Sequence, residues 1–206
     1  MNLIIQLVIG LVLAGVLRPV IAQPTDADAR AKDIAIKVCS ECHGPTGESV
    51  NPKYPNLAAQ QPIYFENQLK AFRNHTRSGL DAQHIMLGKA ERVLEEMLAG
   101  AMARYYASQP APKPVAGDPT LIAKGKELYQ SGSAAHQVPA CIACHGPNAS
   151  GSGIFPRLAG QHKEYLLKQL QLIQSTVRKS PVMHGNIEHL DQNDMPALAV
   201  YLQSLN

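Results

Sequence analysis

The chain carries one short motif twice, and this motif restricts what the chain can fold around. Two cysteines three positions apart are followed at once by a histidine, in Cys39-Ser-Glu-Cys42-His43 and again in Cys141-Ile-Ala-Cys144-His145. On one helical turn, the two thiols of each motif lie on the same side. The two copies use all 4 cysteines of the chain. Each motif therefore directs two thiols and an imidazole toward one common partner.

Covalent haem attachment is the chemistry that this pattern favours. The thiols can add to the two vinyl groups of a haem as thioethers, while the imidazole reaches the iron from one face. Structural zinc sites and redox dithiols also use CxxC pairs and remain the alternatives. The repetition favours haem, so we predict two covalent haem c groups. Their predicted attachment residues are Cys39, Cys42, Cys141 and Cys144, with His43 and His145 as iron ligands.

Length and composition agree with two haem domains. A chain of 206 residues has room for two small domains, and motifs about one hundred residues apart suggest one haem in each. With no Trp, 3 Phe and 7 Tyr, the protein supplies few large apolar groups, so the helices should pack around the porphyrins. The formal net charge of +3 does not support a nucleic-acid surface.

Residues 1–22 have the pattern of a signal peptide. The apolar stretch at 3–17 is short for a membrane span, and Val20 and Ala22 suit a signal peptidase. We therefore predict cleavage after Ala22 and export to the periplasm. No Lys or Arg precedes the apolar stretch, so an uncleaved membrane anchor stays the alternative. Peripheral membrane association of the exported chain is a separate alternative.

The second half of the chain repeats the first. Four matches lie 101 residues apart: Pro55-Asn56-Leu57-Ala58 with Pro156-Arg157-Leu158-Ala159, Gln60 with Gln161, Tyr64 with Tyr165, and Gln68-Leu69 with Gln169-Leu170. Such agreement predicts duplication of one haem-binding unit. Four prolines at positions 110–119 mark a linker at 110–118. The predicted domains are therefore 23–109 and 119–206.

The predicted fold class is all-α. Apolar periodicity predicts helices at 26–38, 62–72 and 89–108 in the first half. The segment 131–138 interrupts the repeat and is expected to be a surface loop. We therefore expect two tandem helical domains, each built around one covalent haem c.

A second protein ligand decides whether each iron can do more than exchange electrons. An iron held by histidine alone keeps an open face for gases or peroxide. Ile85-Met86-Leu87-Gly88 aligns with Val182-Met183-His184-Gly185, so we predict Met86 and Met183 as the second ligands, with His184 as the main rival. Met97, Met102 and Met195 fall inside predicted helices, where methionine more often fills a core. His84 and His189 complete the set of alternatives.

With these motifs the chain resembles the diheme cytochrome c4 family, which has two class I cytochrome c domains in tandem. The resemblance covers nearly all of the mature length. It implies that the carbonyls of Pro55 and Pro156 orient the axial histidines through their second ring nitrogen. One departure is that Ala59 stands where the second half has Gly160. Tyr64 and Tyr165 either contact the haem or a propionate, or simply pack in the core.

The resemblance implies a periplasmic one-electron carrier and not an enzyme. Donors of the expected kind are a small copper protein, a quinol-oxidising complex or another cytochrome, including a membrane-bound one. The expected acceptor is a terminal oxidase or a similar protein. Thioether sulfur favours ferrous iron, so both reduction potentials should be positive. The alternatives are the cytochrome subunit of a flavocytochrome sulfide dehydrogenase and, less favoured, a diheme peroxidase or thiosulfate dehydrogenase.

Overall fold

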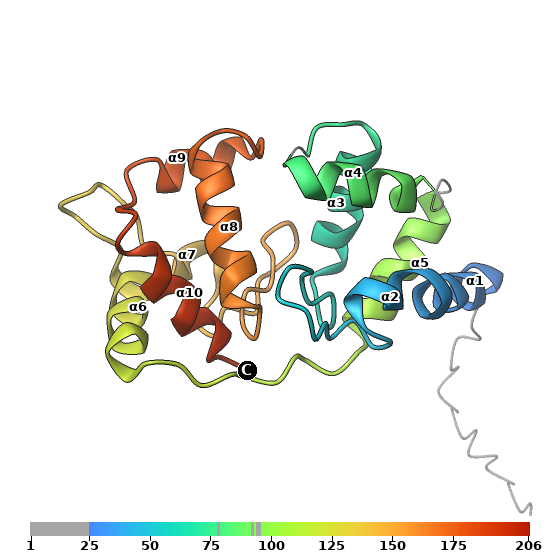
Figure 1. The fold of residues 1–206 in the computed structure, drawn as a ribbon, viewed down its shortest axis with the longest axis horizontal. Helices are drawn as coiled ribbons and strands as arrows, with labels where there is room; N and C mark the ends of the chain where they lie inside the picture. The colour runs from blue at the N-terminus through green and yellow to red at the C-terminus, as the bar shows by residue number, and fades with distance from the viewer. Residues whose placement is uncertain (1–24, 78, 92, 94–95) are drawn as a thin grey trace, which may run out of the picture.

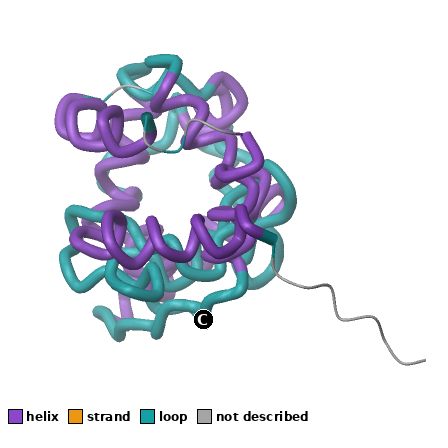
Figure 2. Tube along the Cα trace, turned by 90° about the vertical axis from the view of Figure 1, so that its right-hand side faces the viewer, coloured by secondary structure: helices purple, strands orange, loops and turns teal. Residues whose placement is uncertain are grey.

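The computed structural model describes residues 25–77, 79–91, 93 and 96–206. The predicted leader at 1–22, with its cleavage after Ala22, lies outside these residues. Two helical lobes stand side by side, and the segment 110–118, which contains no helix, runs along their lower edge and joins them (Figure 1). Helices and loops make up the described chain, as Figure 2 shows from the side. Within the described residues, no helix is both long and apolar enough to cross a membrane.

The first lobe is built from α1 (Asp26–Ile34), the π-helical turn η1 (Ala35–Cys39), α2 (Ser40–His43), α3 (Pro62–Arg73), α4 (Leu80–Ala90) and α5 (Glu96–Ala107). A capping box between Thr25 and Asp28 starts α1. The helix predicted at 26–38 continues through η1 and α2 into the first motif. Helix α5 packs against both α1 and α3, so the core of this lobe surrounds α5.

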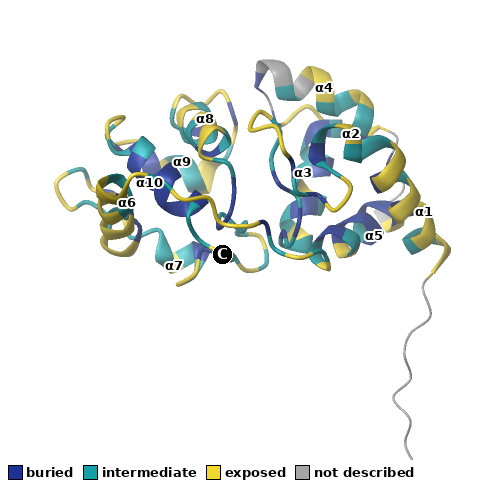
Figure 3. Ribbon diagram, turned by 60° about the horizontal axis from the view of Figure 1, so that its bottom comes forward, coloured by how far each residue is buried: buried dark blue, intermediate teal, exposed yellow. Residues whose placement is uncertain are grey.

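The second lobe repeats this arrangement with α6 (Pro119–Ser131), α7 (Ile142–His145), α8 (Lys163–Gln174), α9 (Pro181–Ile187) and α10 (Met195–Gln203). Helix α10 packs on α6 and α8, and its buried residues contrast with the exposed outer side of α6 in Figure 3. A side chain at Gly125 of α6 would collide with the main-chain carbonyl of Ala197. Glycine there lets the two helices cross closely.

The single helix predicted at 89–108 is wrong. The structure has α4 and α5 instead, and buried Val93 lies between them. The carbonyl oxygen of Val93 accepts a hydrogen bond from Nη1 of Arg73 on α3, at 3.1 Å. This contact comes from a distant part of the chain, so local apolar periodicity cannot indicate it. Met86 lies on α4, ahead of this break.

The segment 131–138 folds back on itself. The main chains of Ser133 and Val138 exchange two hydrogen bonds of 2.8 and 2.9 Å. Most of the segment is exposed or half-exposed, as expected for a surface loop, while Val138 is buried. The 110–118 segment is tied to both lobes, because Lys113 N donates to Glu48 and Val115 N donates to the carbonyl of Gln203.

Candidate functional site

Each cysteine motif ends a short helix that faces the interior. His43 closes α2 and His145 closes α7, and each is only 6% exposed. The chain then turns away at Gly44 and Gly146, whose φ values of 75° and 79° favour glycine. The four cysteines are half-buried, and none of them forms a disulfide. The sequence therefore places both imidazoles and all four thiols at equivalent points of the two lobes.

A backbone carbonyl holds each buried imidazole. Nδ1 of His43 lies 2.8 Å from the carbonyl oxygen of Pro55, and Nδ1 of His145 lies 3.0 Å from that of Pro156. A carbonyl only accepts, so Nδ1 carries the proton and Nε2 keeps its lone pair. Burial lowers the pKa of both imidazoles and favours their neutral form. This tautomer and charge state suit an imidazole that binds a metal through Nε2.

The predicted site residues of both lobes line one cavity of about 1210 Å³. Its wall includes Cys39, Cys42, His43 and Met86 from the first lobe, and Cys141, Cys144, His145 and Met183 from the second. Pro55 and Pro156 line it as well. Each lobe thus offers two thiols, one oriented imidazole and one thioether to the same apolar space. This donor set fits a covalently attached haem in each lobe.

The rivals of the two methionines are placed less favourably. His184 turns away from the cavity, Met97 is 73% exposed, and buried Met195 is not part of the cavity wall. Met102 does line the cavity, as does His84. The second half has Leu198 at the position aligned with Met102, and leucine cannot bind iron. Only the pair Met86 and Met183 places thioethers at equivalent points of both halves among these candidates.

One thiol of each motif differs from the thiols of reactive dithiols. Burial raises the pKa of Cys39, and it raises that of Cys141 to about 11. Reactive dithiols instead have lowered thiol pKa values. Among the described residues, no group of three or more His, Cys, Asp or Glu side chains is arranged to hold a metal ion. Both alternatives are therefore less well supported than haem attachment.

The two turns that hold the histidines also hold each other. Asn56 N donates to Gln161 Oε1 at 2.9 Å, and Gln161 Nε2 donates back to the Asn56 carbonyl at 3.0 Å. The equivalent pair has the lobes exchanged: Arg157 N of the second lobe donates to Gln60 Oε1 of the first at 2.8 Å, and Gln60 Nε2 donates to the Arg157 carbonyl at 3.1 Å. Each glutamine thus pairs with the residue that follows the proline of the other lobe. The sequence aligned these residues but did not indicate that they are in contact.

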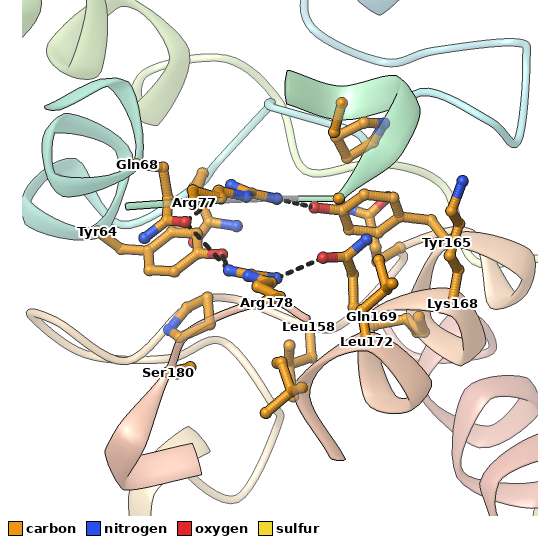
Figure 4. A pocket seen from close by; sticks show the side chains of 18 of the residues that line it. Tyr64, Gln68, Arg77, Leu158, Tyr165, Lys168, Gln169, Leu172, Arg178 and Ser180 are labelled. Carbon is orange, nitrogen blue, oxygen red and sulfur yellow. Dashed lines mark hydrogen bonds between the residues drawn. The ribbon is translucent and has the colours of Figure 1, made fainter. Parts of the chain in front are cut away.

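Tyr64 and Tyr165, whose role the sequence left open, contact arginines of the opposite lobe. Arg77 Nη2 donates to the Tyr165 hydroxyl at 2.8 Å, and Arg178 Nη2 donates to the Tyr64 hydroxyl at 3.0 Å (Figure 4). Burial opposes ionisation of Tyr64, but the guanidiniums of Arg178 and Arg77 outweigh it and lower the phenol pKa. Both arginines line the cavity.

Sequence reasoning missed these arginines, together with Arg157. Arg77 and Arg178 also lie 101 residues apart, so the repeat that aligned the tyrosines contained a signal for them. The repeat did not point to Arg157, because the aligned residue in the first half is Asn56 and not an arginine.

Comparison with known proteins finds similarity through both lobes. A cytochrome c family profile matches residues 122–206. The chain is 35% identical to a cytochrome c4 of Thiocapsa roseopersicina, over 91% of this chain and 95% of that protein. It is 32% identical to a thiosulfate dehydrogenase electron acceptor of Stutzerimonas stutzeri, over 83% of this chain and 80% of that protein. The crystal structure of a reduced cytochrome c4 of Pseudomonas stutzeri has a TM-score of 0.77 at 31% identity, with coverage of 88% and 99%.

Proposed function

The chain belongs to the cytochrome c4 family, and from this premise we propose that it is a periplasmic carrier of single electrons between a donor protein and an oxidising partner. Family membership confirms the fold class, all-α with two class I cytochrome c domains in tandem, and the cofactor, two covalently bound haem c groups. It also makes the chain an electron-transfer protein and not an enzyme. We place the domain limits at 23–109 and 119–206, joined by the linker 110–118.

The proposed attachment and ligand residues follow the repeat. Cys39 and Cys42 attach the first haem, and His43 and Met86 bind its iron. Cys141, Cys144, His145 and Met183 do the same for the second. The observation that carries this assignment is that both sets line one cavity, with each histidine held by the carbonyl of Pro55 or Pro156. Haem c supplies an iron centre that alternates between the ferrous and ferric states.

The protein groups around each site suit electron exchange without proton chemistry. The Nδ1 proton of each histidine is engaged by a carbonyl, so Nε2 presents a fixed lone pair. The soft methionine sulfur favours the ferrous state and raises the reduction potential. With haem bound, His43 and Met86, and likewise His145 and Met183, would occupy both protein-ligand positions of each iron, and none would remain for peroxide or a gas. Buried apolar residues such as Phe72 and Ile173 keep water away from the cavity wall.

We propose export to the periplasm, with the leader at 1–22 cleaved after Ala22. The expected donors remain a small copper protein, a quinol-oxidising complex or another cytochrome, and the expected acceptor is a terminal oxidase. Export of a c-type cytochrome places the thiols where haem attachment occurs and where such partners are found.

The test of this function is a redox titration of the purified haem-loaded chain. A carrier takes up two electrons per chain at positive potentials, shows two haems per chain by the pyridine haemochrome assay, and does not bind carbon monoxide when reduced. Rapid reduction by a copper protein and rapid oxidation by a terminal oxidase complete the assignment. Turnover of peroxide by the chain itself would contradict it.

A second function is supported by a specific similarity. The Stutzerimonas stutzeri relative named above is a thiosulfate dehydrogenase electron acceptor. This chain is also similar to part of the structure of a thiosulfate dehydrogenase from Marichromatium purpuratum. The TM-score is 0.76 at 30% identity, over 87% of this chain and 40% of that chain. In this case the donor is a thiosulfate-oxidising enzyme. Mixing the oxidised chain with such an enzyme distinguishes the two functions, because only an acceptor is reduced when thiosulfate is added.

A further inference from the structure

The hydroxyl of Tyr106, near the end of α5, is buried without a hydrogen-bond partner among the residues that the structure describes. The whole residue is buried, with 0% of its surface exposed. A hydroxyl left without a partner inside a protein is costly, so buried hydroxyls normally find an acceptor. The first lobe therefore contains a buried donor that no described group of the protein accepts.

The ring of Tyr106 is held in one place by its neighbours. It lies against Phe65, with ring centroids 5.3 Å apart, and against Tyr105, at 5.2 Å. A side chain at Gly47 would come within 2.7 Å of the same ring. The main-chain N–H of Ala59 donates to the carbonyl of Tyr106 at 2.8 Å, so the backbone is held as well. The hydroxyl therefore has a fixed position at the wall of the cavity.

The thiol of Cys39, the first cysteine of the first motif, lies beside this hydroxyl. Cys39 and Tyr106 both line the cavity, and Cys39 packs against the buried cluster that contains Tyr106. Burial raises the pKa of both groups, and the thiol raises that of the phenol further. In return, the hydroxyl partly offsets the rise in the pKa of the thiol, as a donor to sulfur does. The hydroxyl and the sulfur of Cys39 are therefore neighbours that can become donor and acceptor.

Leucine occupies the equivalent position of the second lobe. The carbonyl of Leu202 accepts a hydrogen bond from the main-chain N–H of Gly160, at 3.0 Å, in the same way that Tyr106 accepts one from Ala59. Leu202 also lines the cavity. Its side chain has no polar atom, so it offers no hydrogen bond there.

A different tyrosine lies near the first cysteine of the second motif. Tyr129 of α6 is fully buried, and the neighbouring thiol of Cys141 adds to the rise that burial causes in its phenol pKa. The hydroxyl of Tyr129 donates to the main-chain carbonyl of Gly146, at 2.5 Å. Its proton is therefore engaged by the protein, while that of Tyr106 is not.

We propose that Tyr106 tunes the first haem through Cys39, by donating a hydrogen bond to the sulfur once haem is attached there. This inference rests on the two-haem assignment and goes beyond it, because it makes the two haems different. Attachment replaces the S–H bond of the thiol with an S–C bond, so the sulfur can then only accept. A proton donor at this sulfur draws electron density from the haem, favours ferrous iron and raises the potential of the first haem alone.

The test compares Tyr106→Phe with wild type in the haem-loaded protein, because phenylalanine keeps the ring and removes only the hydroxyl. We expect the equilibrium constant for reduction of one haem to fall about threefold, which is about 30 mV for one electron, and that of the other haem to stay unchanged. Spectroelectrochemical titration measures both potentials. The resonance Raman band of the thioether C–S bonds should also shift, since it reports on the sulfur directly.

Two tyrosines whose hydroxyls are engaged by carbonyls are the matched controls. Tyr129→Phe removes the hydroxyl near Cys141 that donates to a main-chain carbonyl. Tyr105→Phe removes the hydroxyl next to Tyr106 in the chain, which donates to the carbonyl of Pro45 at 3.1 Å. Neither variant should change a potential or the C–S band, because neither hydroxyl is free to donate to sulfur.

The outcomes separate this inference from the proposed function. If Tyr106→Phe keeps both wild-type potentials and the wild-type C–S band, the residue only fills the core and the inference is wrong, although two haems per chain still support the carrier. A fall of the same size in Tyr129→Phe or Tyr105→Phe would also overturn it, because an unengaged donor would not be the cause. Fewer than two haems in the wild-type chain would instead overturn the proposed function.

Discussion

Nδ1 of His184 lies 3.1 Å from the main-chain carbonyl oxygen of Ile173. Its other ring nitrogen faces Glu188 Oε2 at 3.5 Å. Both nitrogens of His184 are therefore engaged away from the cavity, while the neighbouring Met183 lines it. This relationship supports methionine over histidine as the second iron ligand, and it agrees with the sequence-based preference for Met183 over its rival His184.

Replacing a ligand methionine should open one iron. We expect Met86→Ala or Met183→Ala to halve the near-infrared absorption band of methionine-bound ferric haem and to let the reduced protein bind one carbon monoxide per chain. The affected potential should fall, because the thioether no longer stabilises ferrous iron. His184→Ala is the control and should leave the band intact. A band that Met183→Ala leaves unchanged, with carbon monoxide binding to reduced His184→Ala, would assign the second ligand to histidine instead.

The close crossing of α6 and α10 predicts a strong effect at Gly125. Gly125→Ala places a methyl group against the carbonyl of Ala197, so the helices must move apart. We expect the free energy of unfolding of the second lobe to fall by about 1–3 kcal/mol. Denaturant titration followed by circular dichroism measures it. Lys126→Ala, at an exposed position of the same helix, should change stability by less than about 0.5 kcal/mol.

The two halves differ at a backbone position that requires a positive φ angle. Ala59 has φ of 54° and Gly160 has φ of 70°, and each donates its main-chain N–H to the last helix of its lobe. Ala59→Gly should raise the stability of the first lobe by about 1 kcal/mol, because alanine is strained in this region. Gly160→Ala should lower that of the second by at least about 1 kcal/mol, since its methyl would also lie 2.9 Å from the carbonyl oxygen of Pro112. Thermal unfolding of both variants tests this, and equal effects of the same sign would contradict it.

The link between α1 and α5 should weaken in acid. The hydrogen bond from Arg104, at 2.6 Å, and those from Thr25 lower the pKa of Asp28 from 3.8 to about 2. The folded pKa is below the unfolded one, so the contribution to stability is present above pH 3.8 and disappears as the pH falls toward 2. Asp28→Asn should therefore be less stable than wild type near neutral pH, with a difference that vanishes in acid.

Thermal unfolding across this pH range measures the difference. Glu127→Gln, on the exposed face of α6, serves as the control. A difference between Asp28→Asn and wild type that stays constant down to about pH 2 would exclude the proposed protonation.

Local sequence patterns predicted much of what positions the site. The motif at Cys141 to His145 specified two thiols and an imidazole on one turn, and the match of Pro55 with Pro156 indicated equivalent turns. Helices at 62–72 and 26–38 followed from periodicity, because one face of each is buried. These features depend on residues close together in the chain.

The remaining features depend on contacts between distant segments. The break at Val93 is held by Arg73, and neither residue signals it locally. The exchange between Asn56 and Gln161 requires that the lobes face each other, which a repeat alone does not state. The same reason hid Arg157, whose main-chain N–H and carbonyl pair with Gln60 of the other lobe.

The most direct test of the account is a proton NMR spectrum of the fully reduced, haem-loaded chain. A methionine methyl group bound to haem iron lies over the porphyrin ring and is shifted strongly upfield. We predict two such methyl signals, one lost in Met86→Ala and the other in Met183→Ala. A spectrum with one signal or none would show that at least one iron lacks a methionine ligand, and would contradict a carrier with two closed haem sites.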